Sequence, residues 1–176
     1  MNKSQLRILI LGNGLSEIPI HLHSAGFTNI TATDVSSTAV DAMKQKCPSI
    51  KWSIVDCTKL EDHFDAGSFD VVFEKGVSDT LQYRRKTKDS FVFLQRMFSG
   101  ISVILEKDYG RYLCITPRRN VPLIKLAQWK WTVKRMQIRK CGSNGFAHPS
   151  KDEKGRLRLL CICMFAVRSM PIITWR

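Results

Sequence analysis

Short apolar runs recur along the chain and alternate with stretches of helical spacing. The first run, "ILIL" at residues 8–11, is continuous and of strand length. A continuous run is typical of a strand buried on both faces, as in a parallel sheet covered by helices. Later runs of strand length predict further strands at 29–34, 50–57, 68–76, 110–116, 131–138 and 157–167.

Helical patterns fill most of the gaps between these runs. Gly12-Asn13-Gly14 ends the first run, and Ser16 then suits the N-cap of a helix that Gly26 ends. In the longest pattern, apolar residues recur at alternating three- and four-residue spacing. Helices are predicted over 16–25, 36–46 (capped by Ser36 or Ser37), about 86–106 and 117–126.

The order of elements predicts an α/β fold. The last two strands are joined by a polar loop at 140–156 rather than by a helix, which favours an antiparallel C-terminal hairpin at the sheet edge. The predicted architecture is a Rossmann-like seven-strand sheet, mostly parallel, with helices on both faces. The 176 residues show no internal repeat and no linker, so one domain over 1–176 is expected.

Composition and charge narrow the class of protein. The chain is 44% hydrophobic and 24% charged, as in globular proteins, and no window reaches membrane-spanning length. A cytoplasmic protein without a membrane partner is expected. Residues 1–80 hold 7 Lys and Arg against 10 Asp and Glu, whereas residues 81–176 hold 21 against 5. The basic second half predicts an acidic or nucleic-acid partner, or is simply a solvated basic surface.

The cysteines and histidines do not predict a metal site. His21 and His23 are two positions apart, so they do not share a helical face. The cysteines form no CxxC pair, and four of them lie in or beside apolar runs, which favours reduced, buried thiols over zinc ligands. The six cysteines are at positions 47, 57, 114, 141, 161 and 163.

Acidic residues recur where predicted strands end. Asp34 lies 22 positions after Gly12, Asp56 another 22 positions on, and Glu74 a further 18. The carboxyl ends of parallel strands line one crevice, and an acid about 20 residues after a glycine turn is where a ribose diol is held. Asp34 is therefore predicted to bind ribose. The alternatives are helix capping by Asp34 and a solvated loop at Asp56.

The glycine turn also indicates which nucleoside cofactor to expect. A dinucleotide-binding turn has a third glycine where this chain has Glu17. A carboxylate there would repel a pyrophosphate, so a cationic cofactor without phosphates fits better. The sequence therefore favours S-adenosylmethionine over a nicotinamide dinucleotide.

Several segments together carry a family resemblance. The most specific of them is "EKG" at 74–76 followed by Asp79. The chain resembles the class I, seven-strand methyltransferases and, more narrowly, the group that modifies lysines on elongation factor 1-alpha. The segments are "ILILGNGLSE", "GFTNITATDVSSTAVDAM", "WSIVDCTKL", "SFDVVFEKGVSDTL" and "GRYLCIT".

The resemblance implies a cofactor site and a pair of catalytic acids. Gly12 and Gly14 would let the backbone approach the methionine part of S-adenosylmethionine, and Asp34 would hold the ribose. Asp56 and Cys57 would lie beside the adenine. The implied cofactor-binding residues are Gly12, Asn13, Gly14, Asp34, Val35, Asp56, Cys57 and Glu74, and the implied catalytic residues are Glu74 and Asp79.

Glu74 carries the predicted chemistry. Beside the sulfonium it would orient the incoming lysine amine and accept its proton, directly or through water. Desolvation in a narrow pocket would keep that amine neutral. The alternatives are a structural ion pair of Glu74 with Lys75 or Arg84, and capping of the next helix by Asp79.

The chain departs from the family pattern in two places. The family reads G-C-G-N-S where this chain has Asn13 and Leu15 in residues 12–16, and it has an N-terminal segment before the first strand that this chain is expected to lack.

The predicted function is methyl transfer from S-adenosylmethionine to a protein lysine, with elongation factor 1-alpha as the expected kind of substrate. The alternatives are an RNA or small-molecule methyltransferase, and a catalytically inactive binding module.

Overall fold

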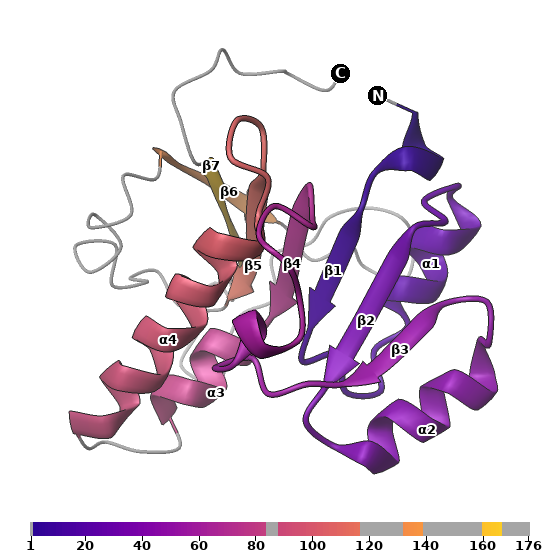
Figure 1. The fold of residues 1–176 in the computed structure, drawn as a ribbon, viewed down its shortest axis with the longest axis horizontal. Coiled ribbons are helices and arrows are strands. Elements are labelled where there is room, and N and C mark those ends of the chain that lie inside the picture. Colours follow the sequence, from indigo (N-terminus) through magenta and orange to yellow (C-terminus); the bar gives the residue numbers. More distant parts are fainter. Residues whose placement is uncertain (1, 84–87, 117–131, 139–159, 167–176) are drawn as a thin grey trace, which may run out of the picture.

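The computed structural model describes residues 2–83, 88–116, 132–138 and 160–166, and its centre is a parallel β-sheet (Figure 1). Five parallel strands lie in the order β3-β2-β1-β4-β5, with β1 in the middle. This confirms the predicted α/β, Rossmann-like fold. The strands are β1 (Ile8–Leu11), β2 (Ile30–Asp34), β3 (Lys51–Ile54), β4 (Val71–Lys75) and β5 (Arg111–Thr116).

Helices cover both faces of this sheet (Figure 1). On one face α4 packs against the strands, and on the other α1 does so. None of the described helices combines the length and the apolar character that a membrane span requires. The helices are α1 (Ile18–Ser24), α2 (Ser37–Lys46), α3 (Val77–Tyr83) and α4 (Lys88–Ile104), with short 3₁₀ turns at Lys3–Gln5 and Leu60–Asp62.

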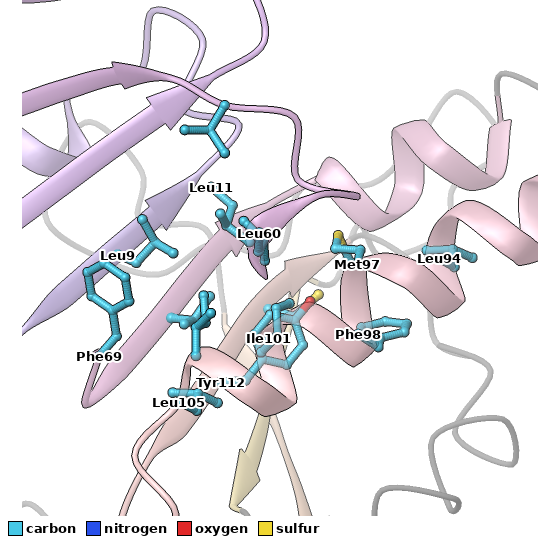
Figure 2. Packing of buried hydrophobic residues seen from close by; sticks show 14 residues of the cluster. Leu9, Leu11, Leu60, Phe69, Leu94, Met97, Phe98, Ile101, Leu105 and Tyr112 are labelled. Atoms are coloured by element: carbon cyan, nitrogen blue, oxygen red, sulfur yellow. The ribbon is translucent and has the colours of Figure 1, made fainter. Parts of the chain in front are cut away.

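The central strand β1 is buried on both faces, as its continuous apolar run predicts. Leu9 and Leu11 point into the larger core cluster with Ile101 of α4, and this packing is visible in Figure 2. Ile8 and Ile10 point the other way, into a second cluster beneath α1. The strand therefore anchors the loop that follows it, residues 12–17, to two hydrophobic layers at once.

Two more strands lie beyond β5 in the described residues. β7 (Leu160–Ala166) pairs antiparallel with β5, and β6 (Thr132–Ile138) pairs antiparallel with β7. The predicted helix over 117–126 and the predicted loop over 140–156 lie outside the described residues.

Local signals predicted one helix start correctly and another incorrectly. Ser36 caps α2 as predicted, because its hydroxyl accepts the backbone N–H of Ala39 at 3.3 Å. The N-cap of α1 is Glu17 rather than Ser16, and the Glu17 carboxylate pairs on the surface with Lys46 at the end of α2. Helix α3 was not predicted, because its seven residues contain too few apolar positions to form a periodic pattern.

Candidate cofactor site

The loop after β1 has the backbone shape that only glycine adopts without strain. Gly12 and Gly14 both have φ of +54°. A side chain at Gly14 would meet nothing within 4 Å, so this part of the loop is open to a bound molecule. At Gly12 a Cβ would lie 2.4 Å from Cγ2 of Val77, so the backbone here is packed against the first residue of α3.

Asn13 braces this loop from inside. Its backbone N–H donates to the carbonyl of Thr33 on β2 at 2.9 Å. Its side-chain amide donates to the carbonyls of Gly14 and Ser16, both at 3.0 Å, and the residue is buried. The Asn13 side chain thus holds the loop in shape, and its predicted contact with the cofactor stays a prediction.

Asp34 lies next to the glycine loop, as its spacing predicts. One carboxylate oxygen accepts the N–H of Gly14 at 2.7 Å, and the other accepts the N–H of Ser36 at 2.9 Å. Each oxygen keeps a further lone pair, and the residue is only half-buried. Asp34 is not the helix cap, because Ser36 has that role. The neighbouring side chain, Val35, is 70% exposed.

Asp56 and Cys57 follow β3 at the same edge of the sheet. One oxygen of Asp56 accepts the backbone N–H of Thr58 at 2.9 Å and its hydroxyl at 2.8 Å, which turns the chain after the strand. Cys57 packs against the larger core cluster. Burial, reinforced by the charges of Asp56 and Glu74, raises the pKa of Cys57 to about 12. Cys57 is therefore a neutral thiol at physiological pH and offers a nonpolar contact surface.

Labelling of native protein tests this placement of the thiols. Burial raises the pKa of Cys114 as well, and the negative charge of the neighbouring Glu74 carboxylate raises it further. Cys57 and Cys114 are expected to react with iodoacetamide about 100-fold more slowly than the same peptides after denaturation. Cys47 is the internal control, because it is only partly buried, at the edge of the second core cluster. Peptide mass spectrometry gives each rate, and equal native rates at all three cysteines would contradict the structure.

Glu74 does not face the cofactor loop's open side. It is 0% exposed, and its carboxylate accepts hydrogen bonds from Val77 N–H (2.7 Å), Ser78 hydroxyl (2.6 Å), Tyr112 hydroxyl (3.0 Å) and Cys114 thiol (2.8 Å). In this structure β4 directs the Glu74 side chain between α3 and β5. The predicted contact of Glu74 with the sulfonium and the amine stays a prediction. The alternative ion pair with Lys75 is absent among the described residues, and Arg84 lies outside them.

Asp79 lies in the first turn of α3, where its charge suits the helix dipole. One of its oxygens accepts the hydroxyl hydrogen bond of Thr116, at the end of β5, at 2.9 Å. This contact joins α3 to the same end of the sheet. It accounts for the position of Asp79 without a substrate, and the predicted catalytic role of Asp79 stays a prediction.

A shallow hollow lies between the glycine loop and the end of β4. Its wall includes Gly12, Asn13, Ser16, Phe73 and Lys75. It therefore opens between the central strands β1 and β4, where the strand order of this sheet reverses direction. In open α/β sheets, such a switch point is the usual place for a ligand. Groups of three or more possible metal ligands are absent from the described part of the chain.

Comparison with known proteins finds similarity to methyltransferases. A family model described as "Methyltransferase domain" matches residues 9–92. EEF1A lysine methyltransferase 4 of Mus musculus is 42% identical over 78 residues, which cover 43% of this chain and 30% of that protein. The eEF1A lysine and N-terminal methyltransferase of Danio rerio is 30% identical over 129 residues, which cover 71% of this chain and 18% of that protein. The chain thus spans less than a third of the length of these relatives.

Solved structures show the same fold at low sequence identity. An S-adenosylmethionine-dependent methyltransferase from Mesorhizobium loti is 16% identical, with a TM-score of 0.64 over 91% of this chain and 90% of that one. The N-methyltransferase NodS from Bradyrhizobium japonicum is 13% identical, with a TM-score of 0.64 over 92% and 85%. These likenesses establish the fold.

The fold, the glycine loop and the family match together define a class I methyltransferase domain, whose cofactor is S-adenosylmethionine. Within that class, the chain is similar in sequence to the eEF1A lysine methyltransferase group. The residues present fit the cofactor: Gly14 leaves open space at the loop, and Asp34 beside it keeps acceptor capacity for hydroxyl groups.

Proposed function

We propose that this chain methylates a lysine of a protein substrate, with eEF1A as the first candidate. The observation that supports cofactor binding is the contact of Gly14 N–H with the Asp34 carboxylate at 2.7 Å, which sets the open glycine and the acid side by side. The names of the relatives support the substrate class, since two groups of them are eEF1A methyltransferases.

Bound S-adenosylmethionine supplies an activated methyl group on a sulfonium. The chain's own part is to hold the cofactor and align the acceptor. Asp34 would accept hydrogen bonds from the ribose hydroxyls, because two lone pairs remain on its carboxylate. The exposed Val35 and the neutral Cys57 thiol would contact the adenine, and the second oxygen of Asp56 would be available to its amino group.

We also propose that the complete domain has the seven-strand architecture with an antiparallel C-terminal hairpin. The backbone register supports this, since β7 pairs with all of β5 from Arg111 to Thr116, and β6 pairs with all of β7. The antiparallel strands would then close the β5 edge of the parallel sheet, a position at which a parallel sheet otherwise exposes unpaired backbone groups.

Calorimetric titration with S-adenosylhomocysteine tests the cofactor site. We expect micromolar binding by the wild type and a loss of about 10- to 100-fold in Asp34→Asn, because a charge-assisted hydrogen bond contributes about 1.5–3 kcal/mol. Asp41→Asn, an exposed acid on α2, is the matched control and should bind like the wild type. A folded wild type that does not bind, or equal binding by Asp34→Asn, would refute the proposal.

Transfer of a labelled methyl group tests the substrate class separately. Incubation with tritiated S-adenosylmethionine and purified eEF1A should label the protein on lysine. The label should survive RNase and disappear with protease. Label that RNase removes from a cell extract would instead identify an RNA substrate, and cofactor binding without any transfer would indicate a binding module.

A further inference from the structure

The buried Glu74 carboxylate joins three elements into one hydrogen-bonded cluster. It comes from β4, and its donors come from the start of α3 (Val77 N–H and Ser78 hydroxyl) and from β5 (Tyr112 hydroxyl and Cys114 thiol). The side chains of Glu74, Ser78, Tyr112 and Cys114 are all buried, each at most 1% exposed. We call these four side chains the Glu74 cluster.

Such a cluster fixes geometry. A carboxylate taken out of water is costly unless its oxygens are satisfied, and here donors from two other elements satisfy both of them. One oxygen is shared by Ser78, Tyr112 and Cys114, so the other is directed at the backbone N–H of Val77. The position of Val77 relative to β4 and β5 is therefore set by the cluster.

Val77 in turn packs against the cofactor loop. A Cβ placed on Gly12 would lie 2.4 Å from Cγ2 of Val77, so the valine side chain occupies the space directly over that glycine. Two residues further along the loop, Gly14 N–H donates to Asp34. A continuous path of contacts therefore runs from the Glu74 carboxylate through Val77 and Gly12 to the acid proposed to bind ribose.

We propose that Glu74 is a positioning residue for cofactor binding, which acts by holding Val77 against Gly12 and so keeps the glycine loop in its binding conformation. This inference rests on the proposed function of the loop as the S-adenosylmethionine site. It differs from the role of proton acceptor that the sequence predicted for Glu74. It also gives a function to Tyr112, Cys114 and Ser78, which are not among the residues that line the hollow beside the loop.

A double-mutant cycle with S-adenosylhomocysteine as the probe tests the path. The variants are Glu74→Gln, Val77→Ala and the double variant, each titrated below its unfolding transition as verified by circular dichroism. Glu74→Gln is expected to weaken binding about 10-fold, because a small displacement of a binding group has effects of this order. In the Val77→Ala background the same substitution should change affinity by less than about twofold, because the link to Gly12 is already removed.

Ile104→Val is the control for loss of stability alone. Ile104 is fully buried at the end of α4, and its carbonyl accepts the N–H of Phe69 just before β4, at the opposite end of the sheet from the site. It should lower the denaturation midpoint and leave affinity unchanged. If Glu74→Gln does not fold, Ser78→Ala takes its place in the cycle, since it removes one donor and keeps the carboxylate.

The outcomes separate the two proposals. The path from Glu74 through Val77 to Gly12 is supported if the wild type binds and if the effect of Glu74→Gln on affinity disappears in the Val77→Ala background. Wild-type binding that Glu74→Gln leaves unchanged, or an effect of equal size in both backgrounds, overturns the positioning role and leaves the cofactor site standing. A folded wild type that binds no S-adenosylhomocysteine overturns both.

Discussion

Replacement of Arg7 by alanine is expected to lower the free energy of unfolding by about 2–3 kcal/mol. Arg7, just before β1, donates from Nη2 to Asp70 at 2.6 Å and from Nη1 to the carbonyl of Gly67 at 2.9 Å, and its backbone N–H donates to Asp70 at 2.8 Å. These bonds join the amino ends of β1 and β4. The expected loss is below the 3–5 kcal/mol typical of fully buried pairs, because the Arg7 side chain is 38% exposed whereas that of Asp70 is 4% exposed.

The effect of this substitution should depend on pH. Burial alone would raise the pKa of Asp70, but the hydrogen bonds and charge of Arg7 outweigh it and the pKa is lowered. A carboxylate with a lowered folded-state pKa stabilises the fold above its unfolded pKa of about 4, and the contribution is lost as pH falls through the folded value. The difference between wild type and Arg7→Ala should therefore be constant from pH 5 to 7 and shrink below about pH 4.

Urea denaturation at several pH values measures both effects. Arg96→Ala is the matched control, since Arg96 is an exposed arginine of α4 for which the described residues provide no ion pair. Its substitution should change stability by less than about 0.5 kcal/mol. Asp70→Asn should lose the pH dependence. An Arg7→Ala variant as stable as Arg96→Ala would show that the pair does not hold the two strands together.

Contacts that are local in sequence could be predicted, and they cover most of the fold. The apolar run of β1, the glycines that follow it and the Ser36 cap each depend on residues within a few positions, so periodicity and capping rules identify them. The place of Asp34 beside Gly14 was predictable too, because parallel neighbours end at one edge and a βαβ unit sets their spacing.

Contacts between distant residues could not be predicted. The partners of Glu74 on β5, Tyr112 and Cys114, lie 38 and 40 positions away, and no pattern in one sequence shows which strand faces a given carboxylate. The sequence therefore indicated an acid at the end of a strand but not whether it faces solvent or the core. Cys114 was interpreted only as a buried thiol, although it also donates to that acid.

Replacement of Gly12 by alanine is expected to lower the free energy of unfolding by about 2–5 kcal/mol and to abolish measurable binding of S-adenosylhomocysteine. Two costs add here. An L side chain at a φ of +54° costs about 1–2 kcal/mol, and a Cβ placed 2.4 Å from Val77 Cγ2 forces displacement that costs about 1–3 kcal/mol more. The displaced atoms are those that position the loop, so cofactor binding is lost together with stability.

Gly14→Ala separates the two costs. Gly14 has the same φ of +54°, and a Cβ there meets nothing within 4 Å, so only the backbone strain of about 1–2 kcal/mol applies. Removal of the clashing methyl groups by Val77→Ala should bring the cost of Gly12→Ala down to that of Gly14→Ala, as measured by chemical denaturation. An undiminished cost in the Val77→Ala background would mean that Gly12 is sensitive to its backbone conformation alone. Because the Glu74 cluster holds Val77 in place, a rescue would also show that the loop after β1 depends on the packing of α3.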